Sequence, residues 1–310
     1  MSLFGSKEAS PMETPLPSSR RRAVACLLAS GLLLAVMDTL IKRLAVDFPV
    51  VQLMFVRCLG SLLVIGAVVL PSRGLTAFRT RRLSAHLLRA LAGVGSMGCF
   101  FYAFKHLPLA DVYVISFAAP LFLTALSAPL LGERVGARRW GAVLIGFCGV
   151  LVIAQPSLDA PPPLPLMVGL VGAAAYALAM IAVRSLAPTE NSLSLVVYFL
   201  LVAGTVGGVA AIPVWVQPGL ADLAIMLAIG VFGAGAQWLL TEAFRLAPAA
   251  TLAPLEYAGL VWALLFGFAV FGDVPTLSVL AGGALIVASG LWVLGHNDEP
   301  LKEAIDPAVS

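Results

Sequence analysis

A few ionisable side chains stand inside long apolar stretches of the sequence. Arg57 and Glu256 lie well inside such stretches, Arg89 lies a few residues into one, and Asp38 lies near the end of another. A charged group surrounded by hydrocarbon is costly unless it is paired or hydrated, so each residue is a candidate for ligand binding or proton transfer. The Arg57 guanidinium could hold a carboxylate or phosphate, and the Glu256 carboxylate could hold a cationic group or carry a proton.

Each of these charged residues also has a purely structural interpretation. Asp38 and Arg57 could form an ion pair that only joins two helices, and Glu256 and Arg89 could form a static bridge. The long side chain of Arg89 could instead extend to the membrane surface. The sequence leaves these alternatives open.

Aromatic side chains that carry a polar group, tyrosines and tryptophans, occur in the same stretches. Their rings could stack on a planar or cationic ligand, or they could anchor helices at the lipid interface. Together with Asp38, Arg57, Arg89 and Glu256, they complete the set of residues predicted to bind substrate. The aromatic members are Tyr102, Tyr113, Tyr176, Trp238, Tyr257 and Trp262.

The stretches that carry these residues dominate the composition. Of the 310 residues, 60% are hydrophobic and 11% are charged, and the mean hydropathy is +1.00. Soluble domains carry about 25% charged residues. The composition therefore excludes an ordinary cytosolic enzyme, a disordered chain and a nucleic-acid-binding protein, and it indicates an integral protein of the lipid bilayer.

The sequence contains no motif for catalysis, ATP binding or metal binding. The Gly-x-x-x-x-Gly-Lys-[Ser/Thr] loop of ATP-driven pumps is absent. The three His and four Cys residues form no cluster with the spacing of metal ligands. We therefore expect no enzyme activity, no metal site and no cofactor.

About ten apolar segments are separated by short connections rich in Gly and Pro. A helix needs roughly 20 mostly apolar residues to cross a bilayer, whereas barrel strands are shorter and alternate in polarity. The sequence therefore predicts an all-α integral membrane protein with ten transmembrane helices. The predicted segments are 23–41, 49–70, 85–104, 109–131, 140–154, 164–183, 193–214, 223–244, 249–271 and 277–294.

The positive charges between the segments predict the orientation. Most Lys and Arg residues in the connections lie on the side of the N-terminus, and the exceptions are Lys42, Arg43 and Lys105. Because such charges accumulate on the cytoplasmic side, we expect both termini to be cytoplasmic, in polar tails at residues 1–22 and 296–310. The expected location is the bacterial inner membrane.

The chain also contains an internal repeat at an offset of about 140 residues. Ala103-Phe104-Lys105 matches Ala243-Phe244-Arg245, and Gly132 matches Gly272. The first five segments (23–155) therefore resemble the last five (164–295). Because five is an odd number, the second copy enters the membrane from the opposite side, which gives two inverted five-helix repeats. The alternative is chance similarity between apolar helices.

Short motifs in both halves resemble an EamA-type member of the drug/metabolite transporter superfamily. They are residues 104–111 (FKHLPLAD), Pro120, 132–135 (GERV), 253–257 (APLEY), 262–263 (WA) and 271–275 (FGDVP). The resemblance covers about residues 23–295. It implies ten helices, cytoplasmic termini, and a central cavity for small amphipathic metabolites, with the fifth and tenth helices at the periphery. The residues around Glu256 and Tyr257 are most similar to the branch that moves S-adenosylmethionine, riboflavin or metallophores.

These observations together predict a secondary active transporter that works by alternating access. Its expected substrate is a small amphipathic or zwitterionic metabolite that is cofactor-like, amino-acid-like or metallophore-like. A channel or receptor-like membrane protein without coupled transport is the alternative. The sequence leaves the direction of transport and the coupling ion open, and the peripheral helices could support a homodimer.

Overall fold

The computed structural model describes residues 17–73, 80, 82–131, 137–154, 163–186, 190, 192–246, 252 and 255–295. Every regular element among them is helical. The helices are α1 (Pro17–Leu44), α2 (Val50–Arg73), α3 (Leu83–His106), α4 (Leu109–Ser116), α5 (Ala119–Leu131), α6 (Ala137–Ala154), α7 (Leu164–Leu186), α8 (Ser192–Ala211), η2 (Ile212–Val214), α9 (Leu220–Leu246), α11 (Ala258–Phe266), η3 (Gly267–Phe271) and α12 (Leu277–Gly295).

Seven stretches of these helices are long and apolar enough to cross a membrane, and they lie in α1, α2, α3, α4 with α5, α7, α8 and α9. Three apolar helical stretches are shorter: Trp140–Ile153, Ala258–Phe271 and Leu277–Ser289. Large apolar side chains also cover the outside of the bundle; Leu63 is 61% exposed and Leu88 is 68% exposed. Such a surface is stable against lipid rather than water. The prediction of an all-helical membrane protein is confirmed.

The segment predicted at 109–131 is broken into α4 and α5. Pro120 has no backbone N–H, so it cannot bond to the carbonyl of Ser116. At the break, the backbone N–H of Ala118 bonds to the Ile115 carbonyl, three residues earlier, at 3.0 Å. The prediction of one continuous helix over 109–131 is therefore wrong at this point, because a single proline interrupts the apolar run.

Most of residues 1–22 and all of residues 296–310, the two predicted tails, lie outside the described residues. Residues 17–22 form the first turns of α1, so this helix begins before the predicted boundary. The Arg22 guanidinium lies 3.7 Å from the carboxylate of Glu242, near the end of α9. Because the start of α1 meets the end of α9, these two helices are antiparallel.

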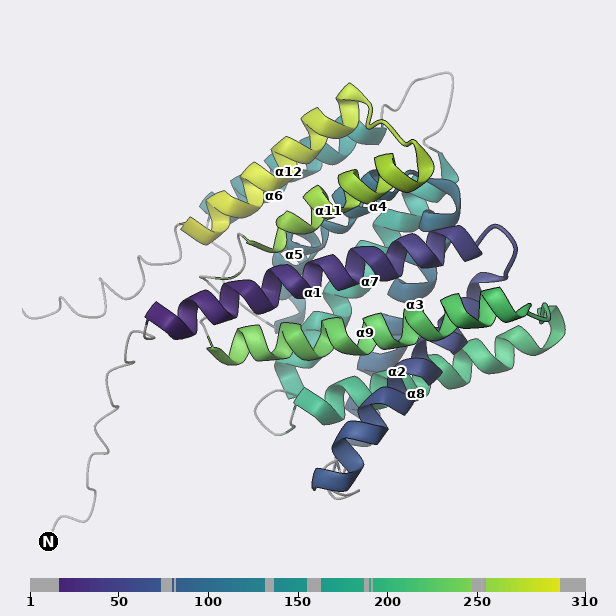
Figure 1. Ribbon diagram of the computed structural model, residues 1–310. Coiled ribbons are helices and arrows are strands. Elements are labelled where there is room, and N and C mark those ends of the chain that lie inside the picture. Colours follow the sequence, from purple (N-terminus) through teal and green to yellow (C-terminus); the bar gives the residue numbers. More distant parts are fainter. Residues whose placement is uncertain are drawn as a thin grey trace, which may run out of the picture.

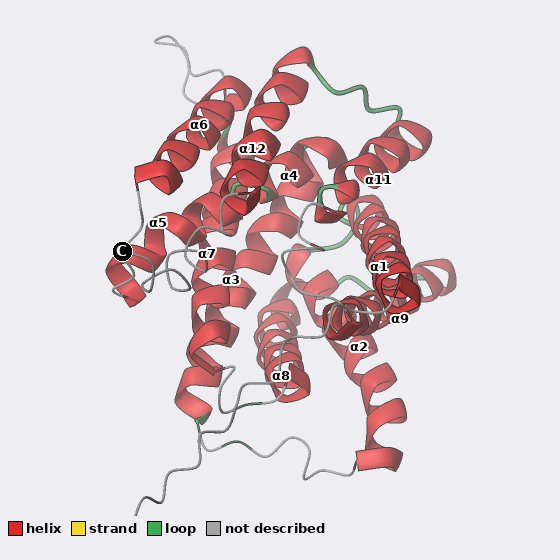
Figure 2. Ribbon diagram, turned by 90° about the vertical axis from the view of Figure 1, so that its left-hand side faces the viewer, coloured by secondary structure: helices red, strands yellow, loops and turns green. Residues whose placement is uncertain are grey.

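Helices from the first and second parts of the chain pack against each other throughout (Figures 1 and 2). The helix α1 lies along α9, α3 lies along α7, and α6 lies along α12. The helix α2 packs against both α8 and α9, and α3 also packs against α8. Each of these pairs joins a helix that precedes residue 155 to one that follows residue 163, so the two parts are interleaved.

Glycine allows the closest of these contacts. A Cβ atom added to Gly149 of α6 would lie 2.6 Å from the carbonyl oxygen of Gly282 of α12. A Cβ atom added to Gly60 of α2 would lie 2.8 Å from the Cα of Gly230 of α9. Both contacts place backbone directly against backbone, which small residues permit in membrane helices.

Candidate functional site

Asp38 of α1 lies where α1, α4 and α11 meet. The hydroxyl of Tyr113, on α4, donates a hydrogen bond of 2.8 Å to Asp38 Oδ2. The Tyr113 ring reaches this position past Gly259 of α11, where an added Cβ would lie 3.3 Å from the ring. The carboxylate is therefore held by a hydroxyl from the neighbouring helix.

Arg57 of α2 is the cation that interacts electrostatically with Asp38. Its guanidinium carbon is 5.6 Å from the centre of the Phe101 ring on α3, a cation–π contact. Asp38 and Arg57 interact electrostatically, but the ion pairs within 4.0 Å among the described residues do not include them. The structural alternative, a close ion pair that joins the two helices, is thus not observed, and no carboxylate or carbonyl in the described part of the chain accepts a hydrogen bond from Arg57.

Trp262 of α11 brings a second unused donor to the same side of α1. Its indole lies 3.6 Å from the position of a Cβ atom on Gly31 of α1. The Nε1 atom is buried, and none of the described residues accepts a hydrogen bond from it. A buried donor without an acceptor costs about 1–3 kcal/mol, so an acceptor on a bound ligand would be favourable here.

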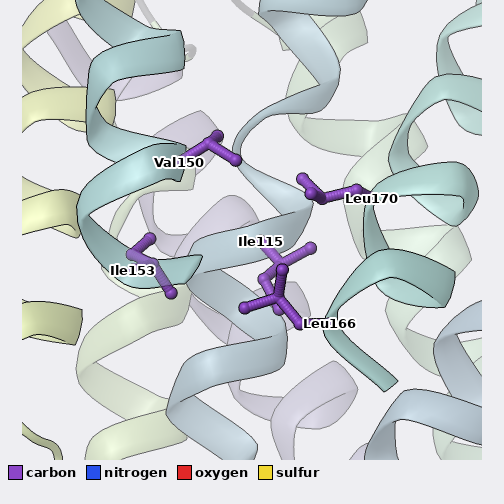
Figure 3. Close-up of a pocket in the computed structure, with 5 residues that line it drawn as sticks. All are labelled: Ile115, Val150, Ile153, Leu166 and Leu170. Carbon is purple, nitrogen blue, oxygen red and sulfur yellow. The ribbon is translucent and has the colours of Figure 1, made fainter. Parts of the chain in front are cut away.

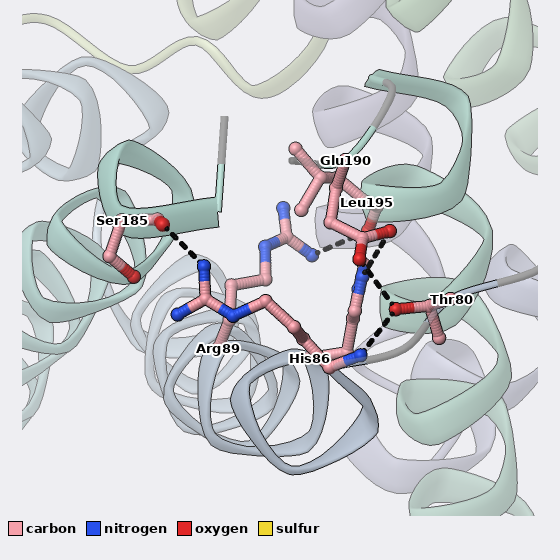
Figure 4. A network of polar contacts seen from close by, with 7 residues as sticks. Thr80, His86, Arg89, Ser185, Glu190 and Leu195 are labelled. Carbon is pink, nitrogen blue, oxygen red and sulfur yellow. Dashed lines mark hydrogen bonds and ion pairs between the residues drawn. The ribbon is translucent and has the colours of Figure 1, made fainter. Parts of the chain in front are cut away.

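Arg89 of α3 belongs to a different environment (Figure 4). Its guanidinium donates from Nη1 to the carbonyl of Leu195 at 3.1 Å and lies 4.8 Å from the centre of the Phe199 ring. Tyr176 interacts electrostatically with both Arg89 and Glu256, and the static Arg89–Glu256 bridge is not among the ion pairs of the described residues. The Glu256 side chain is exposed.

The other predicted aromatic residues are dispersed. The Tyr257 ring packs edge-on against Phe117, at 5.0 Å between ring centres. The Tyr102 ring packs on His106, one turn later on the same helix, at 4.5 Å. Trp238 is 68% exposed on α9. The structure therefore joins Asp38 to Tyr113 by a hydrogen bond, with Arg57 in electrostatic interaction and Trp262 against Gly31, seven residues earlier on α1. Arg89 and Glu256 each interact electrostatically with Tyr176.

A second charged cluster, which the sequence did not predict, lies at the end of α1. Lys42 Nζ lies 2.9 Å from Asp273 Oδ2, donates to the Leu107 carbonyl at 2.8 Å, and lies 4.8 Å from the centre of the Phe271 ring. Gly272, with a φ of 70°, ends η3 in the left-handed conformation and turns the chain so that Asp273 faces Lys42. The one available signal is that Lys42 follows Asp38 by one helical turn, on the same face of α1.

A third polar cluster lies near the start of α3 (Figure 4). Glu190 accepts a hydrogen bond of 2.7 Å from the Thr80 hydroxyl, and its second oxygen lies 3.2 Å from Nε2 of the buried His86. The Thr80 hydrogen bond, followed by the contact with His86, holds the pKa of Glu190 below its usual value of 4.5, although desolvation opposes this shift. Arg82 donates to the Ser185 carbonyl at 3.0 Å. These contacts join the start of α3 to the connection between α7 and α8.

A small apolar hollow with no room for a water molecule lies between α4, α6 and α7 (Figure 3). Its lining residues are Ile115, Val150, Ile153, Leu166 and Leu170. None of these side chains can hydrogen-bond or carry charge, so this hollow does not suit a charged metabolite. It is separate from the Asp38–Arg57 region.

The sequence matches the EamA-like transporter family twice, at residues 21–155 and 164–295. It is 32% identical over 277 residues to the pseudopaline exporter CntI of Pseudomonas aeruginosa, covering 85% of this chain and 95% of the relative. It is 30% identical to a riboflavin transporter of Vibrio cholerae (86% and 91% covered) and 27% identical to an S-adenosylmethionine uptake transporter of Rickettsia bellii (75% and 79% covered). One crystal structure shares the fold with a TM-score of 0.56 and 20% identity, covering 93% of this chain and 99% of that one.

Proposed function

Since this chain belongs to the EamA-like transporter family, we propose that it moves a small amphipathic or zwitterionic metabolite across the bacterial inner membrane by secondary active transport. The named relatives are a pseudopaline exporter, an S-adenosylmethionine uptake transporter and a riboflavin transporter. The proposal concerns the carrier activity. The direction of transport would depend on the gradients of the substrate and the coupling ion across the membrane.

The observation that carries the proposal is the position of Arg57. Its guanidinium lies over the Phe101 ring, and its N–H groups donate to no carboxylate or carbonyl of the described residues. The Asp38 carboxylate accepts its hydrogen bond from Tyr113 instead. A guanidinium with open donors binds a carboxylate or phosphate in a two-pronged geometry. With the buried Trp262 indole N–H nearby on α11, the site suits a ligand that carries an acidic group and a second hydrogen-bond acceptor.

The proposed framework has ten membrane helices in two inverted five-helix repeats, at residues 23–155 and 164–295. Two observations support it. The family matches the chain twice, over 21–155 and 164–295. In the proposed repeat, α1, α2 and α3 correspond to α7, α8 and α9. The packing follows this correspondence, because the contact of α1 with α9 has its counterpart in the contact of α7 with α3, and the contact of α2 with α9 has its counterpart in that of α8 with α3. Inverted repeats give a carrier two access states around one midplane site.

The positive charges support cytoplasmic termini in this arrangement. Arg20, Arg21 and Arg22 precede the apolar part of α1, and Lys42 at its other end is neutralised by Asp273. The end of the bundle that holds Lys42 and Asp273 would then be periplasmic, and the end that holds His86 and Glu190 would be cytoplasmic. A homodimer through the outer faces of α6 and α12 remains part of the proposal.

The experiment is a ligand screen of the purified protein by thermal shift, followed by uptake and counterflow in proteoliposomes. The panel consists of riboflavin, S-adenosylmethionine, amino acids and metallophores. We expect saturable uptake that shows counterflow, which a channel does not show. Arg57→Gln should weaken binding of the active compound by about tenfold to a hundredfold, because a charged hydrogen bond contributes about 1.5–3 kcal/mol.

The matched control is Arg43→Gln, which removes an exposed charge at the end of the same bundle. This variant should bind and transport as the wild type does. Wild-type affinity in a folded Arg57→Gln variant would overturn the role of Arg57, and flux without saturation or counterflow would overturn the carrier.

A further inference from the structure

We infer that Asp38 is a proton-binding site whose protonation decides whether Arg57 is available to an acidic group of the substrate. This inference rests on the proposed function, since it assigns the coupling step to the same site. It begins from the geometry of three side chains on three helices: Asp38 on α1, Arg57 on α2 and Tyr113 on α4.

The first step is the incomplete pairing of the Asp38 carboxylate. Its Oδ2 accepts one hydrogen bond, from the Tyr113 hydroxyl, and the described residues give its second oxygen no hydrogen bond. Within the described ranges, no Lys, Arg or His lies close enough to Asp38 to form an ion pair at 4.0 Å. A half-buried carboxylate held by a single hydroxyl can take up a proton on its second oxygen without breaking an existing bond, because the Tyr113 hydroxyl can still donate to Oδ2.

The second step is the competition for Arg57. Arg57 Nε lies 3.8 Å from the position of a Cβ atom on Gly233. The sulfur of Met37, the neighbour of Asp38, lies 3.1 Å from the same position, so the guanidinium reaches this turn of α1. When Asp38 is ionised, its charge interacts with the guanidinium and opposes a second anion there. When Asp38 is protonated, the Arg57 charge is uncompensated, with only the Phe101 ring beside it. One proton and one acidic group would therefore bind together, and the proton would return to water when the acidic group leaves.

The third step is the surroundings of Asp38, which limit the number of competing groups. Arg57 and Tyr113 are the charged and titratable groups that interact with Asp38 from other helices. Lys42, one turn further along α1, is engaged by Asp273 and by the Leu107 carbonyl, and Asp111 of α4 interacts with that same pair. The described parts of the remaining helices around Asp38 bring no further charged group to it. On α9, Glu242 pairs with Arg22 at the far end of α1. On α3, the Phe101 ring contacts Arg57.

On α11, Gly259 and Trp262 face this region. Glu256, which precedes α11, interacts with Tyr176 instead.

The test needs no ligand. Infrared difference spectra of the protein in liposomes, taken between acidic and mildly alkaline pH, report the C=O band of each carboxyl group that gains a proton. We expect one such band to disappear in Asp38→Asn and to persist in Glu256→Gln and Asp111→Asn, which are the matched carboxylate controls. Arg57→Gln should move the midpoint of the Asp38 band by about one pH unit or more, because the nearby cation stabilises the charged carboxylate.

The outcomes separate this inference from the proposed function. A titrating band that persists in Asp38→Asn and disappears in Glu256→Gln would assign the proton to Glu256 and overturn the inference. An unchanged midpoint in Arg57→Gln would show that Asp38 and Arg57 are not coupled, and it would also overturn the inference. Neither result bears on the saturable uptake measured in proteoliposomes, on which the carrier proposal stands.

Discussion

At the scale of single residues, the protein holds two cations in opposite ways. Lys42 is surrounded by acceptors, since Asp273, the Leu107 carbonyl and the Phe271 ring all contact its ammonium group. Arg57 has an aromatic ring beside it and no acceptor in the described part of the chain. The first arrangement fastens the end of α1 to the chain after η3, and the second leaves a charge ready for a ligand. Sequence position alone does not separate these two roles.

The Lys42 contacts predict a stabilising role. Lys42→Gln should lower the unfolding temperature by a few degrees, because it leaves two carboxylates, Asp273 and Asp111, without their nearby cation. The double variant Lys42→Gln/Asp273→Asn should recover part of the loss, because one of those uncompensated charges is then removed. Thermal unfolding in detergent is the measurement. Lys105→Gln, an exposed lysine, is the control and should leave the unfolding temperature unchanged.

The Glu190 cluster predicts how stability depends on pH. Because the folded state holds the pKa of Glu190 below 4.5, its contribution is present above that value and is lost as the pH falls through the folded pKa. Glu190→Gln should therefore unfold at a lower temperature than wild type near neutral pH, and the gap should narrow below about pH 4.5. An Asp47→Asn control, at an exposed site, should show no such gap. A gap of equal size at every pH would contradict this account.

At the scale of elements, the apolar runs were sufficient to locate the helices, but not to show how each one is rotated. The sequence suggested a contact between Asp38 and Arg57 of α2, which interact electrostatically, but it did not indicate the hydrogen bond that Asp38 accepts from Tyr113 of α4. The break before α5 was missed because Pro120 stands in an otherwise continuous apolar run. The Lys42–Asp273 pair was missed because the two residues are 231 positions apart and Asp273 reads as a turn residue. Helix rotation and distant pairing depend on packing, which a pattern of hydrophobicity does not specify.

The contact between α6 and α12 gives a prediction at the same scale. Gly149→Ala should destabilise the protein by about 1–3 kcal/mol, because the added methyl group meets the Gly282 backbone and neither helix can yield locally. Gly141→Ala, on the same helix but with no atom within 4 Å of the added Cβ, should be neutral or stabilising. Denaturation of both variants in detergent tests the difference. Equal stability would mean that α6 and α12 do not approach as closely as described.

At the scale of the whole molecule, interleaved packing restricts how the two halves can move. The pairs α1–α9 and α3–α7 each contain one helix from either half, so a simple hinge between residues 155 and 163 would separate every major contact at once. A carrier with this packing must instead tilt groups of helices that draw members from both halves.

The proposed inverted repeats predict that equivalent turns of the two halves lie on opposite sides of the membrane. Gly132-Glu133 and Gly272-Asp273 are equivalent in the repeat, so cysteines introduced beside them should differ in access. In a variant without its four native cysteines, Val274→Cys, at a 71% exposed position, should react with a membrane-impermeant maleimide in intact cells. Arg134→Cys should react only after the membrane is permeabilised, because two copies of a five-helix unit joined in sequence must face opposite ways. Labelling of both positions from the same side would rule out inverted repeats. It would also rule out a mechanism in which the two repeats alternate between two conformations to open the site to either side.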